Sequence, residues 1–452
     1  MNLDSQQLQQ LITNIVLNQV QDVGSAPVVA ATNIDATLKS AKKAQNQLVG
    51  LPLKKREQLI CTIRTHIGAH QEQWAKTIVQ NTQMGNCEDK VTSFHLISYY
   101  TPGLDCLEAT VDTGDDGLTL HEYSPYGVVL VSLPYYYAVE ALLSNIISAL
   151  SAGNAIIFGV AEPLYQICQQ IALSINQAIV AQGGPDFLIH IFTENHLQAL
   201  TVHDDIDLLL LTGQEALSSV PFDKKLIVTG SAHTPVLVDE TAQIAQAAEH
   251  IVSGASFDHN LSCLSEKVII AVDAIADFLL HHLVMNGAYL VSQTDMLRRL
   301  EYLLMSENQL KGRSATDILN LLGVYDQQDV KLLIIETDEH HSFVWQDLML
   351  PVLPFVRVKD VDNAINIAAQ ISGKNRHTAV MHSKHIDHLT RCAKTLQTVM
   401  FIKNAPSYAG LGLKGEGFTS FTIAGKTGEG AICARHFSRA RRCVLSEGFL
   451  IK

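Results

Sequence analysis

The eight cysteines include no C-x-x-C pair, so the usual sequence pattern of a structural zinc site is missing. They are scattered at positions 61, 87, 106, 168, 263, 392, 433 and 443, which is not the spacing of a disulfide framework. The nineteen histidines stand mostly alone, without a third ligand at a recognisable spacing. We therefore expect a protein of a reducing cytoplasm that binds no metal ion.

Basic residues are also in short supply. The chain has 32 Lys and Arg against 45 Asp and Glu, and its formal net charge of −13 opposes binding to nucleic acids and to anionic membrane surfaces. No basic region followed by an apolar core opens the sequence, so no secretory signal is predicted. The most apolar region, Tyr126–Val160, is divided by Pro134, Gly153 and Asn154 into pieces of strand and helix length. We expect neither nucleic acid nor membrane as a partner.

The G-x-G-x-x-G fingerprint of dinucleotide binding is absent as well. What the sequence contains instead is a repeated alternation of apolar strand-like runs and amphipathic helical segments, from Gly127 to Val228 and again from Pro235 to Ile402. Such alternation is typical of parallel sheets covered by helices on both faces. We predict an α/β protein with two doubly wound domains, and ligands at the carboxyl ends of the strands, where Thr212-Gly213 lies.

Two other segments have patterns of their own. Apolar residues recur at helical spacing over Leu3–Val20, in a Gln/Asn-rich stretch followed by Gly24-Ser-Ala-Pro27. This predicts an amphipathic helix on a tether, which either packs on its own domain or docks its apolar face in a partner's groove. Residues 110–123 alternate around Asp115-Asp116-Gly117, the strongest kind of short hairpin signal, and predict a two-stranded ribbon.

The stretch Gly254–Lys267 places Cys263 among small and amide-bearing residues, just before the strand-like run Val268–Val272. A thiol at the mouth of a strand is suited to nucleophilic attack. A buried structural thiol is the commoner fate of a free cysteine, and the residues alone leave both interpretations open.

The chain resembles the CoA-acylating aldehyde dehydrogenases, and most closely those of propanediol-utilising and ethanolamine-utilising bacterial microcompartments. The matching segments occur in family order over nearly the whole chain, and together they are highly specific. They are Thr82–Lys90, Glu122–Gly127, Val238–Ala242, Gly254–Lys267, His377–Ser383, Lys403–Gly410, Gly415–Ala424 and Arg441–Leu445.

This resemblance implies the aldehyde dehydrogenase fold and a division of the chain. Residues 36–109 and 124–234 would form the cofactor-binding domain, and residues 235–429 the catalytic domain. Residues 110–123 and 430–452 would form an oligomerisation arm of a homodimer or homotetramer. Residues 1–22 would be a targeting helix on a linker of residues 23–35, which binds microcompartment shell proteins through residues 1–20.

The resemblance also implies a reaction. Cys263 as thiolate would add to the carbonyl of propionaldehyde or acetaldehyde, and the thiohemiacetal would pass hydride to NAD and leave a thioester. Coenzyme A would then accept the acyl group. The cofactor would lie against Pro134, Thr212 and Gly213, and Asp347 would accept the hydroxyls of the nicotinamide ribose.

Several positions depart from the family pattern. Tyr137 stands where relatives carry an asparagine that stabilises the oxyanion, which makes its hydroxyl a candidate replacement donor. Glu162 and Gln214 alter two cofactor loops, and Glu162 brings negative charge toward an anionic dinucleotide. The glutamate that activates water in hydrolytic relatives falls near Thr229-Gly230 and is missing, which favours a thiol as the acyl acceptor.

These departures leave a second interpretation open. A paralogue that kept the fold, the arm and the docking helix but lost efficient catalysis would act as an assembly or interaction partner in the compartment. Acyl-phosphate reduction and oxidation of the aldehyde to an acid are less favoured, because the water-activating base is missing.

Overall fold

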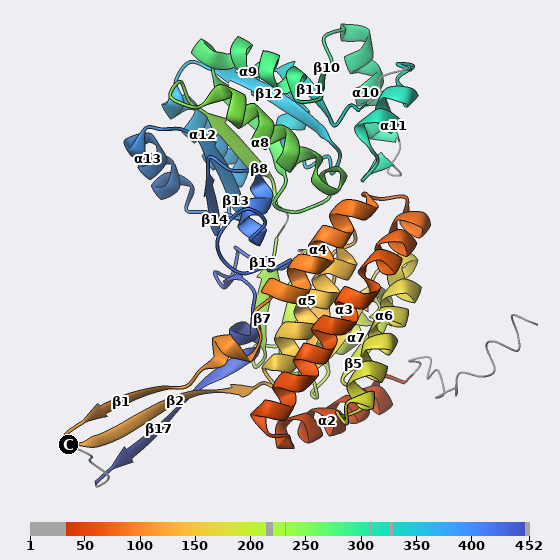
Figure 1. The fold of residues 1–452 in the computed structure, drawn as a ribbon, viewed down its shortest axis with the longest axis vertical. Helices are drawn as coiled ribbons and strands as arrows, with labels where there is room; N and C mark the ends of the chain where they lie inside the picture. The colour runs from red at the N-terminus through yellow and green to blue at the C-terminus, as the bar shows by residue number, and fades with distance from the viewer. Residues whose placement is uncertain (1–32, 214–219, 231, 307–309, 326–328, 448–452) are drawn as a thin grey trace, which may run out of the picture.

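A computed structural model describes residues 33–213, 220–230, 232–306, 310–325 and 329–447. The predicted targeting helix of residues 1–22, and the linker of residues 23–35 as far as residue 32, lie outside the described residues. The described chain forms two helix-covered parallel sheets and a ribbon that projects away from both (Figure 1). The expected α/β architecture is confirmed.

The first sheet has five strands in the order β5-β4-β3-β6-β7, and every pairing in it is parallel. Its central strands consist of apolar residues that are buried on both faces, which explains their continuous hydrophobic runs. The chain turns in opposite directions from β3 to β4 and from β5 to β6, so the carboxyl ends of β3 and β6 flank a crevice suited to ligands. The strands are β3 (Val128–Ser132), β4 (Ala155–Val160), β5 (Ile189–Thr193), β6 (Leu208–Thr212) and β7 (Lys225–Thr229).

Helices cover this sheet on both faces. All fourteen residues of α5 are buried, because the helix lies inside the protein and carries a single charged residue, Glu140. Asn33 and Asn86 cap α2 and α4 by accepting hydrogen bonds from Ala36 N and Asp89 N. The helices are α2 (Ile34–Gly50), α3 (Leu53–Thr82), α4 (Cys87–Tyr100), α5 (Ala138–Ser151), α6 (Glu162–Ala181) and α7 (Leu197–Val202).

The second sheet has seven parallel strands in the order β10-β11-β12-β9-β8-β13-β14. Its strands are β8 (Thr234–Val238), β9 (Glu266–Val272), β10 (Ala288–Leu290), β11 (Leu332–Thr337), β12 (Val352–Val358), β13 (Thr378–His382) and β14 (Met400–Lys403). The sequence analysis missed β10, which is too short to show a pattern. The helices around this sheet are α8 (Ile244–Ser256), α9 (Asp273–Met285), α10 (Thr294–Ser306), α11 (Ala315–Leu321), α12 (Val361–Ser372) and α13 (Ile386–Leu396).

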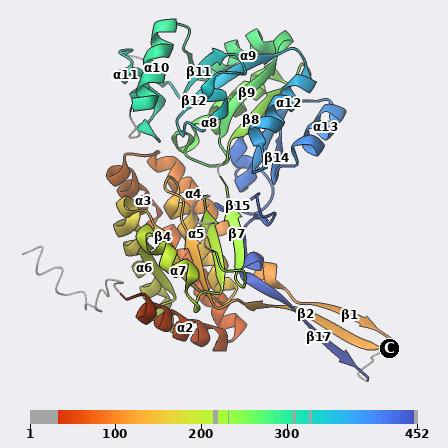
Figure 2. The ribbon, with the colours of Figure 1, turned by 180° about the vertical axis from the view of Figure 1, so that it is seen from behind.

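The projecting ribbon is the predicted hairpin with one added strand. Strands β1 (Thr110–Gly114) and β2 (Gly117–Pro125) pair around Asp115-Asp116, and β17 (Ser438–Ser446) pairs with β2 along its whole length. A Cβ atom at Gly117, whose φ is +123°, would lie 2.1 Å from the carbonyl oxygen of Leu445. Only glycine fits this turn. The ribbon extends away from both sheets in two opposite views (Figures 1 and 2).

A fully buried ion network joins the helices of the first sheet to the loop that follows α8. Lys90 Nζ on α4 lies 3.2 Å from Glu140 Oε1 on α5 and 2.9 Å from Asp258 Oδ2. Burial alone would lower the pKa of Lys90, but the two carboxylates outweigh it and raise that pKa. Burial raises the pKa of Asp258, and Lys90 opposes that rise. Lys90 is therefore the counter-ion that two buried acidic side chains share.

We predict that Lys90→Met lowers the free energy of unfolding by about 3–5 kcal/mol, because it leaves two buried carboxylates without a counter-ion. Urea unfolding at a fixed protein concentration measures this loss. Without Lys90 the folded state favours the protonated acids more than the unfolded state does, so the loss should shrink as the pH falls.

Lys42→Met is the matched control, because the Lys42–Asp205 pair of 2.5 Å lies at the surface. It should cost less than about 1 kcal/mol. Equal losses in the two variants would contradict a structural role for the buried network.

Candidate active site at Cys263

The backbone makes an unusual left-handed turn shortly before Cys263. Asp258, His259 and Asn260 follow α8 and have φ values of +47°, +51° and +66°. A left-handed conformation costs roughly 1–2 kcal/mol for each residue that is not glycine, so three in a row need outside support. His259 Nδ1 lies 3.0 Å from Gly312 O, and Asn260 Nδ2 donates to Ala255 O at 2.7 Å. The ion pair between Lys90 on α4 and the Asp258 carboxylate holds the first of these residues.

Cys263 lies between the two apolar cores. It packs with the core of the first sheet, whereas β9, which begins three residues later, belongs to the core of the second sheet. The side chain is only 7% exposed. A small substrate that reaches this sulfur is therefore largely shielded from water.

The Tyr137 hydroxyl lies beside the Cys263 thiol, close enough to act on its pKa. It stands in the loop between β3 and α5, at the position directly before the helix. Burial raises the pKa of Cys263 to about 11, while the hydrogen bond from Tyr137 and the charge of Lys267 both act to lower it. Burial also raises the pKa of Tyr137 well above its ordinary value, so the hydroxyl stays protonated and remains a donor.

Lys267 is a second group beside the sulfur, and the sequence analysis did not single it out. Its Nζ donates to Asn260 O at 2.8 Å and Asn260 Oδ1 at 2.7 Å, and pairs with Asp347 Oδ1 at 2.9 Å. The structure thus brings the predicted ribose ligand Asp347 close to Cys263, but one of its oxygens is already engaged by Lys267 and by Met349 N.

A small cavity lies at the carboxyl ends of β3, β6 and β7, and Tyr137 forms part of its wall. Pro134 and Thr212, two predicted cofactor residues, also line it, and Gly213 follows directly. The Thr212 hydroxyl donates to Ser132 O at 2.8 Å and lies 3.0 Å from Thr229 Oγ1, so it supports the loop itself. The lining consists of Pro134, Tyr137, Thr212, Thr229, Gly230, His377, Phe421, Thr422 and Ile423.

His377 in this lining was missed by the sequence analysis, although it opens one of the matching segments. Burial lowers its pKa to about 4, so the imidazole is neutral near pH 7. Its Nδ1 lies 2.8 Å from Thr378 Oγ1. A base with so low a pKa is a weak proton acceptor, so His377 gives the cavity wall a neutral polar group.

Thr229 and Gly230, near which the resemblance places the water-activating glutamate of hydrolytic relatives, line the small cavity. The nearest carboxylate in sequence to Cys263, Glu266, accepts hydrogen bonds from Ser407 N at 2.8 Å and Ser407 Oγ at 2.6 Å. Gly254 packs so closely against it that a Cβ atom there would lie 2.2 Å from Glu266 Oε1. Glu266 is held as a structural group.

Glu162 begins α6 at the carboxyl end of β4 and is exposed. It therefore borders the edge of the first sheet at which a dinucleotide would bind. In doubly wound sheets an acidic side chain near the end of the second strand accepts a hydroxyl of the adenosine ribose, and β4 is the second strand here. The altered position 214 lies outside the described residues.

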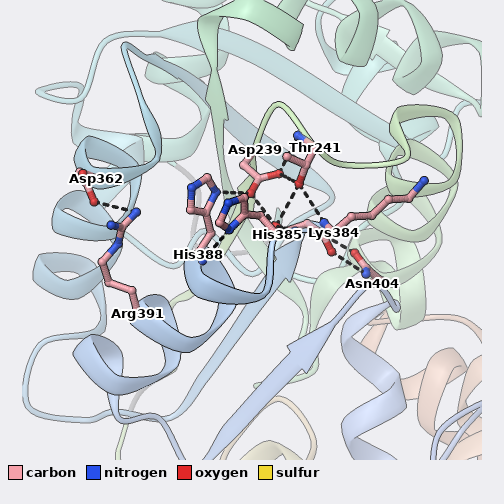
Figure 3. Close-up of polar contacts among 9 residues, drawn as sticks. Asp239, Thr241, Asp362, Lys384, His385, His388, Arg391 and Asn404 are labelled. Carbon is pink, nitrogen blue, oxygen red and sulfur yellow. Dashed lines mark hydrogen bonds and ion pairs between the residues drawn. The ribbon is translucent and has the colours of Figure 1, made fainter.

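A large polar cluster occupies the other end of the second sheet (Figure 3). Asp239, after the carboxyl end of β8, accepts from Ser383 Oγ at 2.5 Å and lies 2.8 Å from His388 Nδ1. Cys263 precedes the amino end of the neighbouring parallel strand β9, so the two sites lie at opposite edges. Across the described part of the chain, no group of three or more His, Cys, Asp or Glu side chains is arranged to hold a metal ion.

Comparisons with known proteins agree with this geometry. The profile of the aldehyde dehydrogenase family matches residues 4–299. Acetaldehyde dehydrogenase (acetylating) EutE of Escherichia coli K12 is 38% identical over 470 residues, which cover 99% of this chain and 100% of the relative.

Two solved structures are similar along most of their length. Rhodopseudomonas palustris propionaldehyde dehydrogenase, with bound CoA and an acylated cysteine, has a TM-score of 0.88 and 38% identity, over 91% of this chain and 97% of that one. The propionaldehyde dehydrogenase of the Clostridium phytofermentans fucose utilisation microcompartment has a TM-score of 0.89 and 34% identity, over 92% and 98%.

Within the described residues no helix is long and apolar enough to cross a membrane. The fold, the buried cysteine beside the carboxyl edge of the first sheet, and the full-length similarity lead to one conclusion. The chain belongs to the aldehyde dehydrogenase family, among its CoA-acylating members.

Proposed function

We propose that this protein oxidises a short aldehyde, acetaldehyde or propionaldehyde, to the corresponding acyl-CoA with NAD as the hydride acceptor. The observation that carries the proposal is the buried Cys263 with Tyr137 and Lys267 beside it, in a site shielded from water. The named substrates of the relatives, acetaldehyde and propionaldehyde, supply the substrate class.

In the first half-reaction the Cys263 thiolate attacks the aldehyde carbonyl, and the negative charge passes to the carbonyl oxygen. Before the attack the Tyr137 hydroxyl acts to lower the pKa of Cys263. It is close enough to the reacting atoms to donate a hydrogen bond to the negatively charged carbonyl oxygen once that oxygen has formed. Hydride leaves the carbon for the nicotinamide ring and a thioester remains on Cys263. Lys267 adds a positive charge that lowers the pKa of the attacking thiol.

In the second half-reaction coenzyme A attacks the thioester, Cys263 leaves as thiolate, and acyl-CoA is released. His377 would face the incoming thiol from the cavity wall as a neutral imidazole, and the thiol would lose its proton to solvent before the attack. Water is a poor competitor, because Thr229 and Gly230 offer no carboxylate base and Glu266 is bound by Ser407. Thiols also ionise far more readily than water.

The residues at the carboxyl edge of the first sheet fit a dinucleotide. Pro134, Thr212 and Gly213 would lie along it, and Asp347 would approach the nicotinamide ribose with the oxygen that Lys267 leaves unengaged. We assign the adenosine ribose to Glu162, which changes the interpretation of this residue from an obstacle to a selective contact. A free carboxylate there repels a 2′-phosphate and so favours NAD over NADP.

We further infer that the protein works inside a bacterial microcompartment, with residues 1–20 binding shell proteins and the ribbon of β1, β2 and β17 joining copies into a homodimer or homotetramer. Support comes from the C. phytofermentans relative, which is named for such a compartment. We assign residues 36–109 and 124–234 to cofactor binding and residues 235–429 to catalysis, with the arm from residues 110–123 and 430–452.

The alternative, a paralogue with impaired catalysis, is not favoured. The chain retains the cysteine, and the tyrosine that replaces the expected asparagine lies beside that cysteine and acts to lower its pKa. Similarity to an acetylating enzyme extends over the full length of both chains.

We predict that Cys263→Ser abolishes NADH formation from propionaldehyde, NAD and CoA, because serine lacks the acidity and nucleophilicity of the thiol. NADH absorbance follows the reaction, and mass spectrometry detects the acylated enzyme when CoA is withheld. Cys61→Ser, at an exposed position on α3, is the control and should keep full activity. A wild-type protein that binds NAD and is alkylated at Cys263, yet forms no NADH with CoA, would refute the proposed function.

We predict that Tyr137→Phe lowers kcat about 100-fold, because one oxyanion donor is lost. The same change removes a contact that lowers the pKa of Cys263, so alkylation by iodoacetamide should slow and its pH profile should shift upward. Tyr135→Phe, in the same loop and exposed, is the control. An unchanged kcat and an unchanged alkylation profile would remove Tyr137 from the mechanism.

We predict that kcat/KM with NAD exceeds that with NADP by about tenfold or more, and that Glu162→Gln reduces this ratio about tenfold by removing the repelling charge. Steady-state rates with each dinucleotide measure the effect. Glu240→Gln, another exposed carboxylate but in the second sheet's region, should leave the ratio unaltered. If Glu162→Gln also leaves it unaltered, the adenosine ribose is not bound there.

A further inference from the structure

Two cysteines far apart in the sequence meet at the base of the projecting arm. Cys106 lies on the short helix η1 (Leu104–Leu107), which leads into β1, and Cys433 directly precedes η8 (Ala434–Phe437), which leads into β17. Helix η1 contacts η8, and the two thiols are close enough for each to act on the other's pKa. Cys106 Sγ itself donates to Gly103 O at 3.3 Å. The Arg435 guanidinium donates to Cys106 O through Nε at 3.2 Å and through Nη2 at 3.1 Å, which fixes the two backbone segments against each other.

The surroundings of the pair suit a reactive thiolate. His436 Nδ1 accepts a hydrogen bond from Cys433 N at 3.0 Å, which holds the ring 3.6 Å from Cys433 Sγ. The hydrogen bond from Cys106 and the contact with His436 hold the pKa of Cys433 below its ordinary value, and the same hydrogen bond raises the pKa of Cys106. One thiol and one thiolate therefore share a proton. Cys106 is partly exposed, which gives a small oxidant access to the pair.

Three other buried cysteines have raised pKa values. Burial raises the pKa values of Cys168 and Cys392 to about 12 and that of Cys263 to about 11. A thiol reacts with peroxide as its thiolate, so these three buried groups are slower targets in the free protein. Neither half-reaction of the proposed function uses Cys106 or Cys433.

We propose that Cys106 and Cys433 form a redox-active dithiol, which a peroxide closes into a reversible disulfide. The Cys433 thiolate attacks one oxygen of the peroxide, the O–O bond breaks, and Cys433 becomes a sulfenic acid while the other oxygen leaves as water. The Cys106 sulfur then attacks the Cys433 sulfur and expels the second water. Two thiols and one peroxide give one disulfide and two waters, a two-electron oxidation.

The disulfide would covalently join the two segments that enter the arm. Arg435 already holds these segments together, so closure requires no large movement of the backbone. A low-molecular-weight dithiol reverses it by exchange. This inference does not depend on the proposed reaction at Cys263, because it can be tested without substrate.

The test uses the full-length reduced protein and one equivalent of hydrogen peroxide. Free thiols are then blocked with iodoacetamide, and the protein is digested without reductant. We expect mass spectrometry to find a peptide pair linked through Cys106 and Cys433, which dithiothreitol separates. Cys443→Ser should form the same link, since that exposed cysteine takes no part.

Two variants probe the order of events. Cys106→Ser should leave a sulfenic acid on Cys433 that dimedone traps, and His436→Gln should slow disulfide formation about tenfold or more by removing a group that lowers the pKa of Cys433. Wild-type protein in which Cys263 is oxidised first, or in which Cys106 and Cys433 are both alkylated after peroxide, would overturn the proposal. A wild-type link that forms at an undiminished rate in His436→Gln would remove His436 from it.

Discussion

The active site depends on the ion network around Lys90. The three left-handed residues that set the direction of the chain before Cys263 are unfavourable by themselves, and Asp258, the first of them, is held by a buried ammonium group from α4. Glu140 on α5 shares that ammonium group, and α5 begins directly after Tyr137. Lys90 therefore links the backbone segment that leads to Cys263 with helix α5, which begins directly after Tyr137.

Burial sets the chemistry of the site through two opposing effects. It excludes water, which protects the thioester, but it also disfavours the thiolate that must form it. Tyr137 and Lys267 partly restore the ionised form, and Asn260 and Asp347 orient the ammonium group of Lys267. Asp347, which the family resemblance assigns to the nicotinamide ribose, thus also positions the Lys267 ammonium group beside the Cys263 sulfur. A single carboxylate would then contact both the cofactor and Lys267.

Much of this architecture could be predicted from the sequence, because buried parallel strands have long apolar runs and the hairpin has a diagnostic turn at Asp115-Asp116-Gly117. The fold class and the family are confirmed. The roles of Lys267 and His377 could not be predicted, because their importance comes from contacts with residues distant in sequence, such as Asp347 and the β6 and β7 loops. Periodicity also gives no sign that Cys106 and Cys433 meet, since long-range packing alone brings them together.

The arm has a consequence for how the protein is made. Its first two strands, β1 and β2, are synthesised within the first third of the chain, but the edge of β2 is completed only by β17, near the end. Until the ribosome has released the C-terminal residues, β2 presents an open edge that can pair with other strands. The three-stranded arm is therefore complete only when β17 has been synthesised and has paired with β2.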